Sequence, residues 1–509
     1  MTTSEDAIKA MRTALDKSMP SDDLAKAGIS TATGLNAYDL RAPALLHIPV
    51  ITPIREKLAR KTRPSPGVAC NWKVISGMTG SGIDGMGYIP EGQRSGVKNI
   101  STKTALSTYV PLGEEGRITD EAILASQGFE DLQSVDRLLT LEKLMMKEEA
   151  SLLFGNKSIR LGTPATPTTG TATAAGATLN TTYYVAVVAL TAEGYQAASV
   201  PGGVVQAMTV TGADGSTFTI NGGSSNKSAI SAGQAVTTGN ALTARTAPIA
   251  GAVAYAWYVG TSASAGALNL QAITTINSVN LTSVVTTTQL ASAITADCSY
   301  NDGTQSGSNP VSAYDGLLTS ALVSGSGGYY YPMADGTFGT GTPLTANGSG
   351  GIVEIDNMFL SMWNLYRVGV DVLYMSANTA LSVSKKMINS TTVRFTKDVN
   401  DADGFHFVGG GIAQAYVSPV GNPYNGGKAA IMIHPNLPDG VIVGWASQLP
   451  AHYRNNETPA VAEILTRRDY YSIDWPRKTR ATEYGVYTDQ CLAVYAPWSM
   501  GVITNINVN

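Results

Sequence analysis

Two stretches near the end of the chain decide the fold: Asp469-Tyr-Tyr-Ser-Ile-Asp-Trp-Pro476 and Tyr484-Gly-Val-Tyr-Thr-Asp-Gln-Cys-Leu-Ala-Val-Tyr495. They close a segment in which helical and strand patterns are mixed. Apolar residues recur with helical spacing over 352–366 and 378–388, and a continuous apolar run over 370–375 is typical of a buried strand. Helices beside a central sheet predict an α+β closing half.

A long helix is predicted upstream of this half, from Thr119 to Phe154. Thr119 can cap it, and acidic residues follow at the positive end of the helix dipole. Apolar residues then recur with helical spacing, and Gly155-Asn156 closes the pattern. The part from Glu130 to Phe154 alone would measure roughly 37 Å at 1.5 Å per residue.

A module of unusually low charge separates the long helix from the closing half. Residues 163–300 contain five charged side chains: Glu193, Asp214, Lys227, Arg245 and Asp297. Alternating strands over 181–190 and 253–259, with glycine and asparagine turns between strands, predict a β-sandwich of immunoglobulin or fibronectin type III style.

The composition predicts a globular chain of several compact units. Hydrophobic residues make up 43 % and charged residues only 14 % of the chain, and the net charge is −4. So sparse a charge suggests surfaces that are buried against other copies. Cys70, Cys298 and Cys491 are odd in number and far apart, which predicts three free thiols in a reducing cytoplasm. The start lacks the pattern of a signal peptide, and no apolar stretch has the length of a membrane span.

A glycine-rich segment predicts the tip of a long hairpin. Residues 71–75 form a strand, 77–87 the tip, and 107–112 the most strand-like part of the return. Gly80-Ser-Gly82-Ile-Asp-Gly85 matches the dinucleotide pattern G-x-G-x-x-G, which requires a helix directly afterwards. Tyr88-Ile-Pro-Glu-Gly92 follows and cannot form that helix, so nucleotide binding is excluded here.

Catalytic and metal-binding motifs are absent from the sequence. The four histidines, His47, His406, His434 and His452, form no H-E-x-x-H pair, and His434 before a proline is interpreted as a turn residue. The acidic stretch 398–404 fails the EF-hand frame, because aspartate stands where the frame needs glycine. We therefore expect no catalytic, cofactor-binding or metal-binding residues.

Two charged clusters are candidates for contacts between subunits. The first is basic, and a salt-bridge role between subunits is favoured over contact with DNA because the chain as a whole is acidic. The second, over 457–483, mixes both signs and is typical of an exposed sheet with cross-strand pairs, or of charges that set the register between protomers. The basic cluster consists of Arg55, Lys57, Arg60, Lys61 and Arg63.

The chain has a long hairpin, a long helix, a module of low charge and an α+β closing half, in this order. In this arrangement it resembles the major capsid protein of tailed bacteriophages, which has the Hong Kong 97-like fold. The resemblance covers roughly residues 40–160 and 305–509. It implies an N-terminal arm, an extended loop, a peripheral domain built on the long spine helix, and an axial domain, with the sandwich inserted. The implied boundaries are 1–65 for the arm, 66–116 for the loop, 117–160 for the spine helix, 161–303 for the insert and 304–509 for the axial domain and remaining peripheral strands.

The resemblance implies a structural protein without enzymatic activity. Copies of the chain would assemble into hexamers and pentamers of an icosahedral head that encloses double-stranded DNA. It further implies a separate scaffolding protein, a portal, a decoration protein, non-specific contact with the packaged DNA, assembly in the cytoplasm of a bacterial host, and no membrane. The predicted inter-subunit residues are Arg55, Arg60, Lys61, Arg63, Gly82, Asp84, Glu91, Arg94, Arg467, Arg468, Arg477 and Arg480.

Two other functions stay open at this point. A phage tail or adhesion protein with the sandwich as a binding module is supported by the threonine-rich insert, but the long helix and the α+β half disfavour it. An enzyme that displays a sandwich is disfavoured by the absence of motifs. Cross-linking through Lys98 or Lys103 of the loop is unsupported, because no asparagine partner can be assigned.

Overall fold

A computed structural model describes residues 49–63, 67–79, 86–127, 131–286, 288–348, 350–388, 415–417, 427–450, 453 and 460–508. The chain divides into two compact units. The larger one comprises Val50–Ile118 and Asp136–Asn509, and the described part of the smaller one is Pro49, 119–127 and 131–135. In the described residues, no helix has both the length and the apolar character needed to cross a membrane.

The helix predicted to run unbroken from Thr119 is instead two helices. Helix α3 covers Asp120–Ala125, and Thr119 Oγ1 accepts the Ala122 N–H at 3.4 Å. Helix α4, Leu132–Phe154, starts separately. Asp131 caps the first turn of α4, because its carboxylate accepts hydrogen bonds from the N–H of Gln133 at 3.2 Å and from the hydroxyl of Ser134 at 2.6 Å. An aspartate cap inside a predicted helix therefore ends one helix and begins the next.

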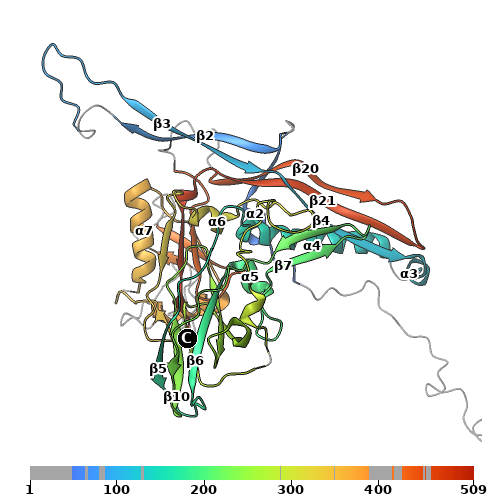
Figure 1. Cartoon of the computed structure of the whole chain (residues 1–509). Helices are drawn as coiled ribbons and strands as arrows, with labels where there is room; N and C mark the ends of the chain where they lie inside the picture. Colours follow the sequence, from blue (N-terminus) through green and yellow to red (C-terminus); the bar gives the residue numbers. More distant parts are fainter. Residues whose placement is uncertain are drawn as a thin grey trace, which may run out of the picture. The chain divides into compact units, whose positions relative to one another are not determined.

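The closing half contains a mixed six-stranded sheet with helices packed against it, so the predicted α+β class is confirmed (Figure 1). The strands in spatial order are β14 (Tyr329–Pro332), β22 (Met500–Thr504), β19 (Ile442–Trp445), β16 (Val372–Met375), β18 (Lys428–Ile433) and β17 (Ala415–Val417). The other elements of this half are α6 (Leu317–Leu322), α7 (Val353–Tyr366), α8 (Ala377–Ile388), η5 (Pro497–Ser499), and the short parallel pair β15 (Thr342–Pro343) and β23 (Ile506–Asn507).

Two glycines let helix α7 approach the centre of this sheet. Gly444 and Gly501 are opposite each other on neighbouring strands. A Cβ on either would come within 2.6 Å of the Met358 side chain of α7. The thioether chain therefore lies over bare backbone, and Phe359 and Met362 are buried beside it.

A long antiparallel ribbon runs beside α4 (Figure 1). Strands β20 (Ala462–Asp474) and β21 (Ala481–Val494) pair along most of their length, and they contain the two closing stretches of the sequence. Strands β1 (Ala59–Thr62) and β4 (Val110–Thr119) complete this four-stranded sheet at its edges. The short helix α2, Pro53–Lys57, precedes β1.

The predicted hairpin is formed by β2 (Ala69–Thr79) and β3 (Asn99–Thr108), which pair with each other and with no other described strand. Residues 107–112 are predicted to be the most strand-like part of the return segment, but Tyr109 divides them: β3 belongs to the hairpin and β4 to the ribbon. At the root, Trp72 packs edge-on against Tyr495 at 5.4 Å between ring centroids. Cys70 and Cys491 are buried there, and all three cysteines are free thiols.

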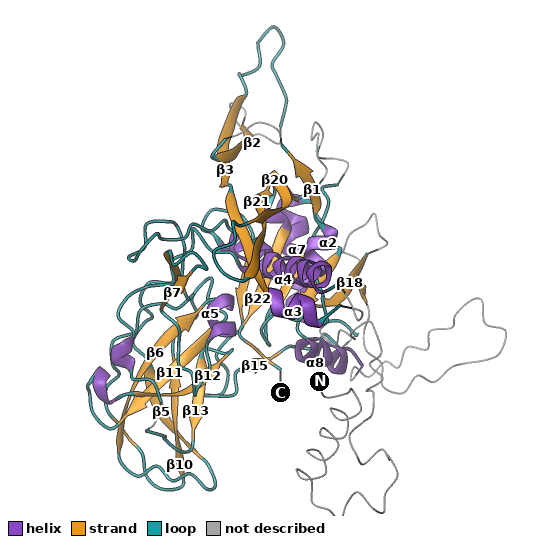
Figure 2. Cartoon of the chain, turned by 90° about the vertical axis from the view of Figure 1, so that its right-hand side faces the viewer, coloured by secondary structure: helices purple, strands orange, loops and turns teal. Residues whose placement is uncertain are grey.

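Two sheets packed face to face make up the insert (Figure 2). Trp257, Tyr183 and Leu242 are buried in the core of this sandwich. The four-stranded sheet is buried on its other face too, because Val188, Tyr258 and their neighbours form a second cluster beneath α5. The first sheet has the order β13 (Ser278–Leu281), β10 (Asn240–Arg245), β5 (Thr168–Thr173); the second has the order β12 (Asn269–Thr274), β11 (Ala254–Gly260), β6 (Thr182–Leu190), β9 (Gln234–Ala235). The insert also contains α5 (Ala192–Ala197), η2 (Ala265–Ala267), η3 (Ala291–Ala293) and the hairpin of β7 (Ala207–Thr211) and β8 (Thr217–Asn221).

Candidate functional site

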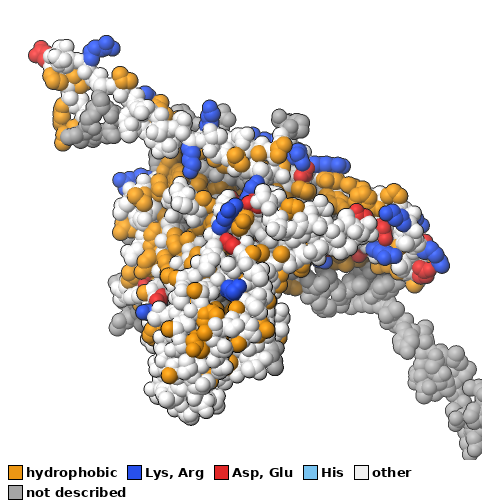
Figure 3. All heavy atoms as spheres, viewed as in Figure 1, with side chains coloured by type: hydrophobic (Ala, Val, Ile, Leu, Met, Phe, Trp, Pro, Cys, Tyr) orange, Lys and Arg blue, Asp and Glu red, His pale blue; other side chains and the backbone are white. Residues whose placement is uncertain are grey.

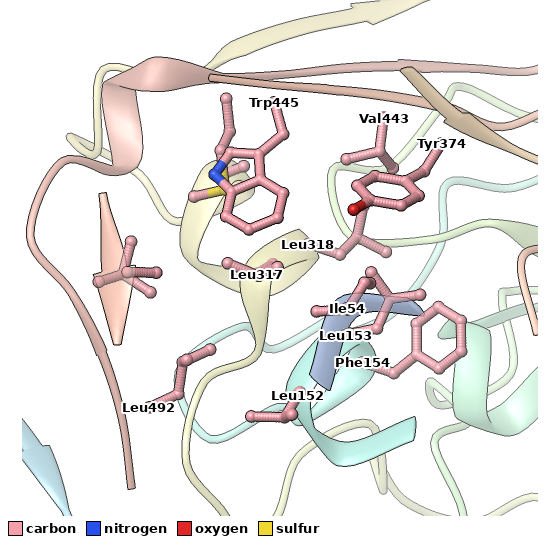
Figure 4. Packing of buried hydrophobic residues seen from close by; sticks show 14 of the residues in the cluster. Ile54, Leu152, Leu153, Phe154, Leu317, Leu318, Tyr374, Val443, Trp445 and Leu492 are labelled. Atoms are coloured by element: carbon pink, nitrogen blue, oxygen red, sulfur yellow. The ribbon is translucent and has the colours of Figure 1, made fainter. Parts of the chain in front are cut away.

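Helix α4 contains two consecutive glutamates near its C-terminal end, Glu148 and Glu149, whose side chains are fully buried. Figure 4 shows the apolar core around the end of this helix, where Leu152, Leu153 and Phe154 meet residues of α2, α6 and the six-stranded sheet. Burying a carboxylate costs several kcal/mol unless partners compensate it. Their partners therefore show what the two glutamates hold together.

Glu149 holds the start of helix α2. Its Oε1 accepts the N–H of Ile54 at 2.9 Å and its Oε2 accepts the N–H of Arg55 at 2.8 Å. The first N–H groups of a helix have no partner within the helix, and its N-terminus carries a partial positive charge. A carboxylate from a distant part of the chain thus caps α2, while Ile54 is buried in the core below.

The third partner of Glu149 is His434, which is also fully buried. His434 Nε2 lies 2.8 Å from Glu149 Oε1, and His434 Nδ1 accepts the N–H of Asn436 at 3.2 Å. Since Nδ1 accepts, the proton lies on Nε2, and the neutral imidazole donates to the carboxylate. His434 does lie in the turn that follows β18, as the sequence predicts, and it fastens this turn to α4.

Glu148 holds the basic segment and the ribbon. Its carboxylate contacts Arg55 Nε at 3.0 Å, Arg60 Nη1 at 2.5 Å and the hydroxyl of Tyr470. Burial, together with the Glu148 carboxylate, raises the pKa of Tyr470 to about 12. The hydroxyl therefore stays protonated and donates a hydrogen bond to Glu148. The two guanidinium groups also lie over the Tyr470 ring, at 4.4 Å for Arg60 and 5.5 Å for Arg55.

Arg60 extends the cluster across the ribbon. Its Nε contacts Asp469 Oδ1 at 2.7 Å, and its Nη2 donates to Thr488 Oγ1 at 3.0 Å and Gln490 Oε1 at 2.9 Å. One side chain therefore bonds to both long strands and to α4. We call the set Glu148, Glu149, Arg55, Arg60, His434 and Tyr470 the carboxylate joint. Its groups satisfy one another, so the joint acts as a clamp between four segments of the larger unit.

The two glutamates of this joint are not among the residues predicted from the sequence. Thr140, Leu144, Glu148 and Leu152 follow one another at four-residue spacing, and all four are buried. A single acid on the apolar stripe of a helix is the signal that could have found Glu148. The partners could not have been found, because His434 is separated from Glu149 by 285 positions.

The basic cluster has partners within the chain. Arg55 and Arg60 belong to the joint, and Lys61 Nζ contacts the nearly buried Glu463 Oε1 at 2.5 Å. Lys57 lies 5.3 Å from the centre of the Trp445 ring. The backbone of Arg63 donates to Thr466 O at 2.9 Å. The contact between subunits predicted for Arg55, Arg60, Lys61 and Arg63 stays a prediction.

The predicted arginines of the mixed-charge stretch lie on or next to the ribbon. Arg467 binds Asp489 Oδ2 with two nitrogens, at 2.9 and 2.6 Å, across the two long strands. Arg468 lies 3.6 Å from the centre of the Tyr471 ring. Arg477 Nη2 donates to Thr482 Oγ1 at 2.9 Å, and Arg480 is exposed in the turn between the strands. A role of these residues between protomers stays a prediction.

The hairpin exposes apolar side chains over its length. Tyr88 is 93 % exposed, Val97 is 88 % and Met78 is 70 %. Glu91 and Arg94 are exposed in the same segment, whereas Gly82 and Asp84 lie outside the described residues. So do His47, His406, His452 and the stretch 398–404. Within the described ranges, no group of His, Cys, Asp and Glu side chains could hold a metal ion.

Comparison with known proteins finds likenesses in structure alone. No family model and no curated protein sequence matches the chain. The chain is similar to the capsid of a native GTA particle (TM-score 0.42, 9 % identity, covering 94 % of this chain and 97 % of the other). It is similar to the capsid of Myoviridae phage XM1 (TM-score 0.41, 9 % identity, covering 94 % of this chain and 99 % of the other). It is also similar to the SrpI encapsulin of Synechococcus elongatus (TM-score 0.40, 8 % identity, covering 95 % of this chain and 97 % of the other).

Proposed function

We propose that this chain is a shell-forming structural protein, the major capsid protein of a tailed bacteriophage. Copies of the chain form hexamers and pentamers, and these close into the head that encloses double-stranded DNA. The observation that carries the proposal is the β2–β3 hairpin, whose apolar side chains are exposed in a single copy.

Such a hairpin needs a partner for physical reasons. A two-stranded ribbon is marginally stable alone, and three or more strands or a packed face are needed for stability. The β2–β3 hairpin pairs with no other described strand, and Val97, Tyr88 and Met78 remain exposed. Contiguous exposed apolar surface marks a site of protein–protein contact. A second copy of the chain is the partner that a shell supplies at every position.

The carboxylate joint supports the same function. The joint clamps α2, α4, the ribbon and the turn after β18 through buried charges, and removing one partner of such a pair is strongly destabilising. The hairpin root packs on the same ribbon through Trp72 and Tyr495. The hairpin is therefore linked to the core of the subunit through its root and the carboxylate joint.

The low charge of the insert is visible on its surface. The face of the insert in Figure 3 carries few charged side chains. A scaffolding protein, a portal, a decoration protein and non-specific contact with packaged DNA complete the proposed assembly, which takes place in the cytoplasm of a bacterial host and ends in the virion. The proposed role is structural, without catalysis.

The proposal is tested by making the hairpin polar. In one variant Met78, Tyr88, Ile89 and Val97 are replaced by serine. In the control, Met208 and Val285 of the insert, two apolar residues that are about half-exposed, are replaced by serine. Each full-length chain is expressed with its genomic neighbours and sedimented. We expect shells for the wild type and the control, and folded but unassembled protein for the hairpin variant. Shells of normal yield from the hairpin variant would contradict the proposal.

A further inference from the structure

A groove lies at the root of the hairpin, with a volume of about 330 Å³. That is the lower end of the size range of ligand pockets. Trp72, Leu492, Val494 and Pro497 give it apolar walls, and Lys103 and Lys157 bring positive charge to it. The groove therefore combines an apolar surface with two cations.

Two further observations define what the groove can accept. Asp315, the only carboxylate among its described lining residues, is already bound by the backbone N–H groups of Lys157 at 2.8 Å and Ser158 at 3.0 Å. Lys157 Nζ donates to Thr108 Oγ1 at 2.8 Å, and both residues line the groove, so the ammonium group is held there. The groove thus suits a segment that carries a carboxylate beside apolar side chains.

The far part of the hairpin presents such a segment. Pro90–Gln93 forms a turn closed by the Gln93 N–H and the Pro90 carbonyl at 3.1 Å. Gly92 has a φ of +76°, which a glycine adopts without strain and which places Glu91 at the corner of the turn. Tyr88 and Ile89 directly precede it and are 93 % and 50 % exposed. One acid with an aromatic and an aliphatic neighbour is thus presented together.

The turn cannot occupy the groove of its own chain. Lys103 is the groove residue that Glu91 would face, and it lies four residues from Asn99, the far end of the same strand β3. Four residues of extended chain span about 13 Å, at roughly 3.3 Å per residue. The segment that contains the turn continues beyond Asn99, further away from the root of the hairpin (Figure 1). Any copy of the segment that fills the groove must come from another chain.

We propose that the Tyr88–Glu91 segment of one copy docks in the root groove of the next copy. Glu91 faces Lys103 and Lys157, and Tyr88 and Ile89 lie against Trp72, Leu492 and Val494. This inference rests on the proposed function and names the contact that the hairpin makes. Turn and groove are different surfaces, so the contact is heterologous and repeats from copy to copy around a ring.

Charge reversal tests the docking. Glu91→Lys and Lys103→Glu are made separately and together in the full-length chain, expressed with its genomic neighbours. Like charges placed opposite each other repel, so each single variant should assemble at least about tenfold less. The double variant restores the pair and should recover most of the assembly. Lys98→Glu, a reversal on the same hairpin outside the docking segment, serves as the control and should assemble as the wild type does.

The outcomes separate the two proposals. Because all of these side chains are exposed, thermal unfolding of each variant should match the wild type, and this is measured first. Single variants that assemble normally, or a double variant that stays as impaired as the singles, would overturn the docking while a wild type that forms shells upholds the proposed function. A wild type that forms no shell would overturn both.

Discussion

Individual residues explain the stability of the carboxylate joint. Glu149 satisfies two backbone N–H groups of α2 and the imidazole of His434 at once. Glu148 balances two guanidinium groups and a phenol. Each glutamate therefore offsets the cost of its burial through several partners, and each partner depends on the same side chain.

Removing one glutamate should unbalance this set. Glu149→Ala leaves the N–H groups of Ile54 and Arg55 and the His434 Nε2–H without an acceptor in a buried site. We expect the free energy of unfolding to fall by about 3 kcal/mol or more. Urea denaturation measures it, and Glu142→Ala, at a partly exposed position of the same helix, should change it by no more than about 0.5 kcal/mol. Equal, small effects of the two variants would show that the joint contributes little.

Glu193 provides a second prediction at the residue scale. Burial raises the pKa of Glu193 from 4.5 to about 7. The folded chain therefore holds this proton over a pH range in which the unfolded chain has released it. Stability from this group is fully present below about pH 4.5 and is lost as the pH rises towards and through about 7.

Glu193→Gln should remove this pH dependence. We compare the thermal unfolding midpoints of wild type and variant at about pH 5 and about pH 8. The expected result is that the wild type loses more stability than the variant between the two values, because only the wild type must ionise a poorly solvated carboxyl. If both chains change in parallel, the side chain is better solvated in the folded state than its surroundings indicate.

At the scale of elements, glycines decide how strand β4 lies on the ribbon. A Cβ at Gly116 would come within 2.5 Å of the Tyr484 ring. That ring is buried, and its hydroxyl is held by Thr140 at 3.1 Å, so it cannot turn aside. The absence of a side chain at Gly116 is therefore a packing requirement of the pair β4 and β21.

We expect Gly116→Ala to lower the free energy of unfolding by about 1–3 kcal/mol, the usual cost of forcing an extra group into a filled site. Gly77→Ala is the matched control, because a Cβ there meets no atom within 4 Å. Denaturant unfolding of both variants gives the comparison. A Gly116→Ala chain as stable as the Gly77→Ala chain would mean that Tyr484 can move.

Several elements could be predicted from the sequence because the signals are local. Helix α7 and strand β16 have the expected bounds to within a few residues, since their apolar period is uninterrupted. The break before α4 could not be foreseen from periodicity, because Asp131 fits a helix until its side chain is seen to cap the next one. The division at Tyr109 depends on which strands β3 and β4 pair with, and pairing is a tertiary property.

The candidate site was less accessible to prediction than the elements. The density of basic residues along the chain points to Arg55 and Arg60, and their contact with another subunit stays a prediction. The sequence could not show that both arginines also pair with the buried Glu148 of α4. The sequence shows which residues carry charge. It does not show which acidic residues pair with them, because these partners lie about 90 to 400 positions away along the chain.

At the scale of the whole molecule, the insert leaves and rejoins the rest of the larger unit at one place. Asn301 N donates to Asn156 O at 2.9 Å, and Leu161 N donates to Ser299 Oγ at 3.0 Å. The Asn277 N–H also donates to Asn505 Oδ1 at 2.7 Å, which ties the insert to the last strands of the chain. Adjacent ends and a core of its own are properties of a domain that can fold alone.

We therefore expect an excised fragment, residues 161–303, to fold. Circular dichroism should show strand content and a cooperative thermal transition, because the clusters around Trp257 and Tyr258 lie within the fragment. A fragment with the point substitution Trp257→Ala should lose the transition or unfold at a much lower temperature. An excised fragment without a transition would show that the insert depends on the rest of the chain.

Assembly is the property that tests the account most directly. The full-length chain, expressed with its genomic neighbours, is examined by negative-stain electron microscopy. We predict closed icosahedral shells, or rings of five and six copies, because the exposed hairpin needs a neighbouring copy. Tubes with a wide lumen would favour a tail protein, and uniform small particles under every condition, including with a supplied scaffold, would contradict the proposed function.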